Sequence, residues 1–367
     1  MAGLPPAAPS GFTDHTFKLA CGTEIAVRVW PAETLVQKPA PFIIWTHGGG
    51  WFGGFHDFAP LPWMAPGFRQ RGYHFVSHNY RLAPQARVDD QLADCLKAVS
   101  WCRANLPSIL GAGQVDVDRY VLCGESAGGH LATLMGLHLF NPPPRAIVDV
   151  YGVVDFLSMK AFGPPDQRPS RATQGPWNGK FSEATLNKLL RDRDPANGLT
   201  DALPWDEFTR LTETWISERW ATEFRYTDRV LMQAELHMMH SLSRSADGLH
   251  VGIMHRERFP SEELFMAFVR SMSPLRVLQQ RVTQGRRGLD LYPPTAFLHG
   301  TADVDVPVEQ SYAMAGVLKE AGVPVVECYE EGGLHVFDMK YSGPEVPGWD
   351  TYIEPILDFV DKHVGPK

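Results

Sequence analysis

The feature that most constrains this chain is the segment 124–128, which reads Gly-Glu-Ser-Ala-Gly. A β-rich apolar run at 120–123 precedes it, and an apolar helical stretch at 127–140 follows it. A serine in this context lies on a sharp strand-to-helix turn that pushes its hydroxyl out above a sheet. Side chains at the two glycines would collide with neighbouring backbone there. The pattern therefore predicts an α/β fold in which Ser126 is a nucleophile.

Short apolar runs alternate with helical patterns over the rest of the chain. We expect strands at 42–46, 73–77, 120–123, 146–151, 295–298 and 325–329, and helices at 91–106, 127–140, 310–321 and 352–364. An antiparallel pair is expected over residues 15–30. Strands that alternate with helices form βαβ units and a mostly parallel central sheet flanked by helices.

This alternation stops between residues 155 and 285, a stretch that has no strand pattern. It holds seven of the twelve Met and four Trp, and its periodic segments at 183–191, 206–242 and 261–281 favour helices. We predict an α/β core made of residues 1–154 and 286–367, with residues 155–285 inserted as a large helical cap, or lid, over Ser126.

A glycine run follows the first predicted parallel strand, where residues 47–51 read His-Gly-Gly-Gly-Trp. Glycines let backbone N–H groups approach a substrate carbonyl without obstruction, as the oxyanion of an acyl-transfer reaction requires. The N–H of the residue after the serine completes such a site. The predicted donors are Gly49, Gly50 and Ala127.

A serine nucleophile needs a base, which in this fold follows the acid along the chain. Asp303 and Asp305 both lie in the loop after the strand at 295–298, and Asp303 is favoured because residues 306–307 can start the next helix. His335, in a glycine loop, is favoured as the base over His363 near the C-terminus. In this hypothesis His335 takes the proton of Ser126, and Asp303 holds its tautomer.

Together these residues resemble the α/β-hydrolase superfamily, and within it the hormone-sensitive-lipase-like esterases. The resemblance rests on His-Gly-Gly-Gly-Trp at 47–51, Tyr-Arg-Leu-Ala-Pro at 80–84, Gly-Glu-Ser-Ala-Gly-Gly at 124–129, and the segment 299–307 with His335. It covers about residues 15–155 and 273–365, and it implies the α/β-hydrolase fold, the catalytic residues and the oxyanion loop, with no metal and no organic cofactor.

Two departures from the family affect the substrate. In the esterases the acid is often followed by Pro-Leu, but Asp303 is followed by Val-Asp-Val-Pro, which resembles peptidase-like and formamidase-like hydrolases. The insertion is also far longer than the cap segment of small esterases. The leading hypothesis is hydrolysis of a bulky, apolar carboxylic ester, such as a secondary metabolite. The alternatives are a transesterase or lactone-forming cyclase acting on a polyketide-like chain, a formamidase or amidase, and a non-catalytic receptor.

Side chains for substrate contact are harder to choose from sequence. Trp51 beside the glycines, and Trp215 and Met238 in the insertion, are the candidates, because aromatic and Met side chains adapt to apolar ligands. Core packing explains the same residues equally well. Glu125 is expected under the serine turn, with no catalytic role.

Composition narrows the partners. The formal charge is −8, with no Lys/Arg-rich run, which argues against nucleic acid as a partner. The chain has no apolar stretch long enough for a membrane span and no signal-peptide pattern, and its five scattered cysteines favour reduced thiols and a cytoplasmic location. The expected partner is a small-molecule ester or acyl substrate, and a homodimer is compatible with the sequence.

Overall fold

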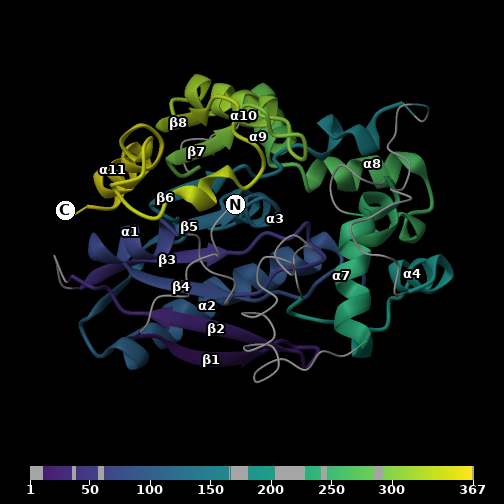
Figure 1. The fold of residues 1–367 in the computed structure, drawn as a ribbon, viewed down its shortest axis with the longest axis horizontal. Helices are drawn as coiled ribbons and strands as arrows, with labels where there is room; N and C mark the ends of the chain where they lie inside the picture. The colour runs from purple at the N-terminus through teal and green to yellow at the C-terminus, as the bar shows by residue number, and fades with distance from the viewer. Residues whose placement is uncertain are drawn as a thin grey trace.

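An eight-stranded sheet forms the centre of the computed structural model (Figure 1), which describes residues 11–34, 39–56, 62–164, 166, 181–202, 228–240, 246–284 and 292–365. The strands follow the spatial order β1-β2-β4-β3-β5-β6-β7-β8. Pairing is antiparallel from β1 to β2 and from β2 to β4, and parallel across the rest. The strands are β1 (Thr13–Lys18), β2 (Glu24–Trp30), β3 (Ala40–Thr46), β4 (His74–His78), β5 (Val115–Glu125), β6 (Ala146–Val150), β7 (Thr295–Gly300) and β8 (Val325–Glu330).

Helices cover both faces of this sheet. The described helices are α1 (Met64–Gln70), α2 (Val88–Leu110), α3 (Ala127–Met135), α4 (Glu183–Leu190), α7 (Asp228–His240), α8 (Glu262–Ser271), α9 (Pro274–Thr283), α10 (Glu309–Glu320) and α11 (Glu354–Val364). The predicted architecture, a mostly parallel sheet between helices, is confirmed.

Alternate side chains of each central strand enter different apolar cores. Phe42 and Ile44 of β3 pack with residues of α2, α3, α9 and α10, whereas Ile43 and Trp45 pack with residues of α1 and α11. Because both faces are buried, these strands read as continuous apolar runs in the sequence. Each large apolar side chain buried in this way stabilises the fold by about 1.5–3 kcal/mol.

The strand predictions differ from the structure mainly at the ends. β5 begins at Val115, five residues before the predicted run, and α3 ends at Met135 rather than residue 140. The helix predicted at 261–281 is two helices, because Pro274 starts α9 after the end of α8. Part of the helix predicted at 206–242 lies outside the described residues, and α7 covers its end.

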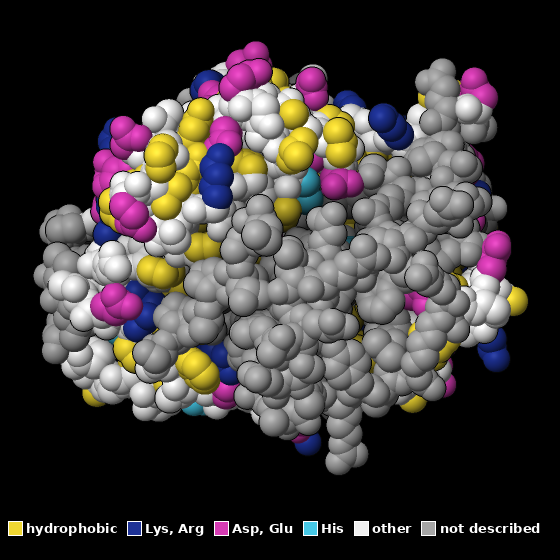
Figure 2. Space-filling view, viewed as in Figure 1, with side chains coloured by type: hydrophobic (Ala, Val, Ile, Leu, Met, Phe, Trp, Pro, Cys, Tyr) yellow, Lys and Arg dark blue, Asp and Glu magenta, His cyan; other side chains and the backbone are white. Residues whose placement is uncertain are grey.

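The surface charges, the cysteines and the lengths of the helices bear on which partners the protein can have. Acidic side chains are interspersed with Lys and Arg over the upper part of the face in Figure 2. Cys21 is exposed, and the other four cysteines are buried and unpaired. None of the described helices combines the length and the apolar character that a membrane crossing requires.

Gly128, in the serine turn, provides a direct test of how closely α3 packs against the end of β3. A Cβ at Gly128 would overlap the carbonyl oxygens of Thr46, the last residue of β3, and of His47, which follows it. We expect Gly128→Ala to lower the free energy of unfolding by about 1–3 kcal/mol, because the clash is with backbone. Gly316→Ala in α10 is the control, since its Cβ would meet no atom within 4 Å. The control should gain about 0.5–1 kcal/mol. Urea unfolding measures both, and equal effects would contradict the close approach.

Candidate active site

Ser126 lies at the junction of β5 and α3 in an unusual backbone conformation. Its φ is 50° and its ψ is −118°, a region that residues other than glycine rarely adopt. Its N–H donates to the carbonyl of Val150 on the neighbouring strand, at 2.9 Å. The surrounding packing holds the turn in place, and Ser126 caps the amino end of α3, where the helix dipole favours negative charge.

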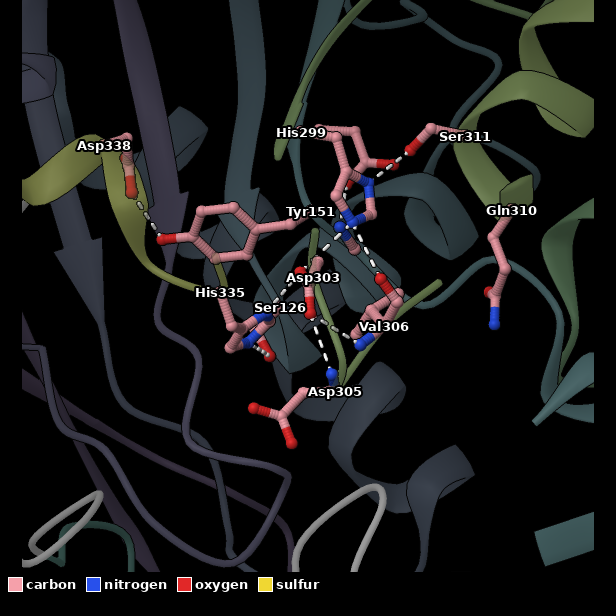
Figure 3. A network of polar contacts seen from close by, with 12 residues as sticks. Ser126, Tyr151, His299, Asp303, Asp305, Val306, Gln310, Ser311, His335 and Asp338 are labelled. Carbon is pink, nitrogen blue, oxygen red and sulfur yellow. Dashed lines mark hydrogen bonds and ion pairs between the residues drawn. The ribbon is translucent and has the colours of Figure 1, made fainter. Parts of the chain in front are cut away.

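Two loops bring His335 and Asp303 to this serine (Figure 3). Asp303 follows β7 and His335 follows β8, and these strands are parallel neighbours, so their carboxyl ends lie side by side. His335 Nε2 lies 3.1 Å from Ser126 Oγ, and His335 Nδ1 lies 2.6 Å from Asp303 Oδ2. The three residues predicted from chain order therefore form one hydrogen-bonded line.

The Asp303 carboxylate is held by more donors than His335 alone. Its Oδ1 accepts the backbone N–H groups of Asp305 and Val306, each at 2.9 Å. Its Oδ2 also lies 3.2 Å from Nε2 of His299, a fully buried residue. His299 Nδ1 contacts Ser311 Oγ at 2.8 Å. Sequence reasoning assigned His299 no role, although it lies near the end of β7, four residues before Asp303.

These contacts shift the pKa values of Asp303 and His335 in opposite directions. Burial by itself would raise the pKa of Asp303, but the hydrogen bonds from His299 and His335 hold that pKa well below its usual range. Burial would lower the pKa of His335, but the hydrogen bond and the charge of Asp303 raise it above the usual value. Asp303 is therefore an ionised partner that stabilises a protonated imidazole at His335.

Asp305 lies close to the same residues. Ligand atoms of Asp303, Asp305 and His335 lie within 4.8 Å of one another, and this is the one such cluster in the part of the chain that the structure describes. Hydrogen bonding between Asp303 and His335 accounts for most of this closeness. Between the two candidate acids, the structure brings the carboxylate of Asp303 to His335, and Asp305 gives its backbone N–H to Asp303.

The glycine loop after β3 is fixed at several points. The Tyr80 hydroxyl donates to the carbonyl of His47 at 3.0 Å, and the Gly48 N–H donates to Oε1 of Glu125 at 3.0 Å. The carbonyl of Gly49 accepts N–H groups from the next turn. Among the described residues, no acceptor is recorded for the N–H groups of Gly49, Gly50 and Ala127. A rigid loop with free N–H groups is what an oxyanion site needs.

The three residues expected to contact substrate have different outcomes. Trp51 is fully buried, and its indole N–H donates to Nδ1 of His130 at 3.2 Å. Its ring centroid lies 5.2 Å from that of Phe156, so Trp51 packs the core behind the glycine loop. Trp215 lies outside the described residues, and Met238 lies in α7, where its side chain is not described.

Described parts of the insertion contact the loops at the carboxyl ends of β3 and β4. Gln233 of α7 donates to the carbonyls of Phe52 and Ala83. Residues Gly54 and Ala202 form an antiparallel bridge just beyond the glycine loop. Figure 1 shows α4, α7 and α8 grouped at one end of the sheet. Helix α7 and the segment at Ala202 therefore support the loop that follows the predicted oxyanion donors.

Comparison with known proteins agrees with this fold. A family model described as BD-FAE matches residues 31–188. The chain is 31% identical over 355 residues to the non-reducing polyketide synthase Preu6 of Preussia isomera, a match that covers 94% of this chain and 14% of that protein. It is 32% identical over 143 residues to esterase LipC of Mycobacterium tuberculosis, covering 35% of this chain and 34% of LipC. A solved arylesterase structure superposes with a TM-score of 0.55 at 18% identity, covering 99% of this chain and 88% of that one.

The mostly parallel sheet, the serine turn and the superposition on the arylesterase show that the chain has the α/β-hydrolase fold, as predicted. The chain is also similar in sequence to an esterase over 35% of its length. It spans only a small part of the polyketide synthase and about a third of LipC.

Substitutions at the two candidate acids test which of them acts on His335. Asp303→Asn should lower kcat for a chromogenic ester by about 10⁴-fold, because an amide cannot stabilise the His335 imidazolium or select its tautomer. Asp305→Asn is the matched control, since its backbone N–H survives the change. Steady-state kinetics compare the two, and a larger loss in the control would assign the acid to Asp305.

Proposed function

We propose that this protein is a serine hydrolase that cleaves a carboxylic ester through an acyl-enzyme on Ser126. The observation that carries the proposal is the hydrogen-bonded line from Ser126 Oγ through His335 to Asp303. Similarity to esterase LipC supports an ester as the substrate.

Each residue has a defined part in the proposed reaction. His335 Nε2 removes the proton of Ser126 as its Oγ attacks the ester carbonyl, and the same proton then goes to the leaving alcohol. Asp303 stabilises the imidazolium in both steps. The N–H groups of Gly49, Gly50 and Ala127 receive the oxyanion. Water activated by His335 then attacks the acyl-enzyme and frees the carboxylic acid.

The described contacts of the insertion support a lid at the end of the sheet that carries Ser126. Helix α7 and the segment at Ala202 pack on the loop beyond the oxyanion glycines, at the end of the sheet where α/β proteins bind ligands. We therefore propose that residues 155–285 form a lid that limits the entry of water and selects the acyl chain. Trp215 and Met238 stay candidates for its inner surface.

A second candidate differs in what resolves the acyl-enzyme. The similarity to a polyketide synthase extends over 94% of this chain, far more than the match to LipC. It favours a polyketide-like acyl group, delivered as an oxygen ester or a thioester. A hydroxyl of that chain, in place of water, would then close a lactone. The three proposed catalytic residues serve either outcome unchanged.

Removing the nucleophile tests the core of the proposal. Ser126→Ala should lower kcat for p-nitrophenyl butyrate by about 10⁶-fold, because no acyl-enzyme can form. Its fold should be intact by circular dichroism, since Ala fits the site. Mass spectrometry of the wild-type protein after treatment with a fluorophosphonate should show one adduct on Ser126. A variant with more than a tenth of the wild-type rate would refute the mechanism.

Paired substrates test the acyl group and its acceptor together. An N-acetylcysteamine thioester of a long hydroxy acid should be consumed at least about tenfold faster, by kcat/KM, than the acetyl thioester, because apolar burial adds about 0.8 kcal/mol per methylene. Chromatography of the products then separates free acid from lactone. A preference for acetyl would refute the bulky substrate, and lactone as the main product would favour the second candidate.

A further inference from the structure

A cluster of buried polar groups lies behind the Ser126–His335 pair. It consists of Glu125 at the end of β5, Tyr151 just after β6, and Asp338 three residues beyond His335. Each of the three is 5% exposed or less. The Tyr151 hydroxyl donates to Asp338 Oδ1 at 2.8 Å, and Glu125 Oε2 lies 3.5 Å from the same hydroxyl. Figure 3 shows Tyr151 beside His335 and linked to Asp338.

This buried carboxyl cluster reaches the predicted oxyanion site through Glu125. Its Oε1 accepts the N–H of Gly48 at 3.0 Å, one residue before the first predicted donor. The loop lies directly against this side chain, since a Cβ at Gly48 would stand 3.1 Å from Cγ of Glu125. The hydrogen bond therefore fixes the peptide that leads into Gly49 and Gly50.

On the other side, the cluster supports the base. The ring centroid of Tyr151 lies 4.7 Å from that of His335. Asp338 holds Tyr151 in this place and also accepts the indole N–H of Trp63 at 2.9 Å. One connected set of contacts thus joins the oxyanion loop, the serine turn and the segment that carries the base.

The contacts also indicate which carboxyl carries a proton. Burial raises the pKa of Asp338, but the hydrogen bonds from Trp63 and Tyr151 lower it. Because each oxygen of Asp338 accepts a donor, Asp338 is better suited than Glu125 to be ionised. Glu125 has one donor, from Gly48, and its second oxygen faces a hydroxyl that already gives its proton to Asp338. Burial and the charge of Asp338 raise the pKa of Glu125 to about 8, whereas the charge of His335 lowers it. The titratable groups that interact with Glu125 are Asp338, His335, Tyr151, Tyr80 and Cys123.

We propose that Glu125 is a positioning residue that works as a neutral carboxylic acid, holding the Gly48 peptide so that the N–H groups of Gly49 and Gly50 point at the oxyanion. The proposal rests on the ester-hydrolase function proposed above. Glu125 touches neither substrate nor the reacting atoms and acts through the loop.

Two substitutions of similar volume separate this role from simple packing. Glu125→Gln keeps an acceptor for Gly48 and stays uncharged, so its kcat should be within about threefold of wild type. Glu125→Met fills the space without an acceptor of that kind, so kcat should fall about 10- to 100-fold with KM nearly unchanged, because misplaced oxyanion donors weaken only the transition state.

Asp149→Asn is the matched control for these kinetics. Asp149 is another buried carboxyl, whose pKa burial raises to about 7, but it accepts the N–H of Gly152 and does not contact the glycine loop. Its kcat should be that of wild type. Equal losses in the Gln and Met variants at position 125, a full kcat in the Met variant, or a rise in KM alone would each overturn the positioning role.

A stability measurement tests the charge state without any substrate. Glu125 has an ordinary pKa of 4.5 and a pKa of about 8 in the folded protein, so between these values the folded state keeps a proton that the unfolded chain has lost. Stability contributed by that proton falls as pH rises through the window, and Glu125→Gln removes the dependence.

The Tm of Glu125→Gln minus the Tm of the wild type should therefore increase as the pH is raised from about 5 to about 8.5. A difference that stays constant or reverses would show that Glu125 is ionised and would overturn the proposal. This result does not depend on activity, so it holds even where the wild-type protein hydrolyses no ester. If the wild-type protein hydrolyses no ester, the proposed function is refuted, and the stability data alone decide the charge state of Glu125.

Discussion

The close approach of backbone at the serine turn is the constraint on which the rest of the site depends. Gly128, at the start of α3, lies so near the carbonyls of Thr46 and His47 that a single Cβ would not fit. This contact ties the end of β3 to the helix behind Ser126, and the glycine loop begins directly after that strand end. A shift of β3 against α3 would therefore move the proposed nucleophile, Ser126, and the predicted oxyanion donors apart.

Much of the core could be predicted from sequence because buried parallel strands are apolar on both faces. The run at 42–46 is such a strand, and it pairs in parallel with residues 120–124 of β5, which include the apolar run at 120–123. The polar first half of β5, residues 115–119, has no such pattern and was not predicted as strand. Helix α1 was not predicted either, since it has seven residues and contains Pro66 and Gly67, which are poor helix signals.

In the candidate site, too, some residues could be predicted from the sequence and others could not. Ser126, Asp303 and His335 could be found because each follows a strand in a fixed chain order. The residues that support them could not, because their partners are distant in sequence: Tyr151 and Asp338 are 187 residues apart. Such contacts follow from the three-dimensional register of the loops, which local pattern does not encode.

Two buried acids at the candidate site, Asp303 and Glu125, are placed in opposite environments. Asp303 receives four donors and is ionised, which suits a group that must face a developing imidazolium. Glu125 receives one donor and stands near a second carboxyl. A negative charge at Glu125 would repel an oxyanion bound by the proposed donors Gly49 and Gly50, whereas a neutral acid keeps the hydrogen bond to Gly48 without that repulsion. The asymmetry of donors thus lets one carboxyl stabilise positive charge while the other, one residue from the nucleophile, adds no charge that opposes the reaction.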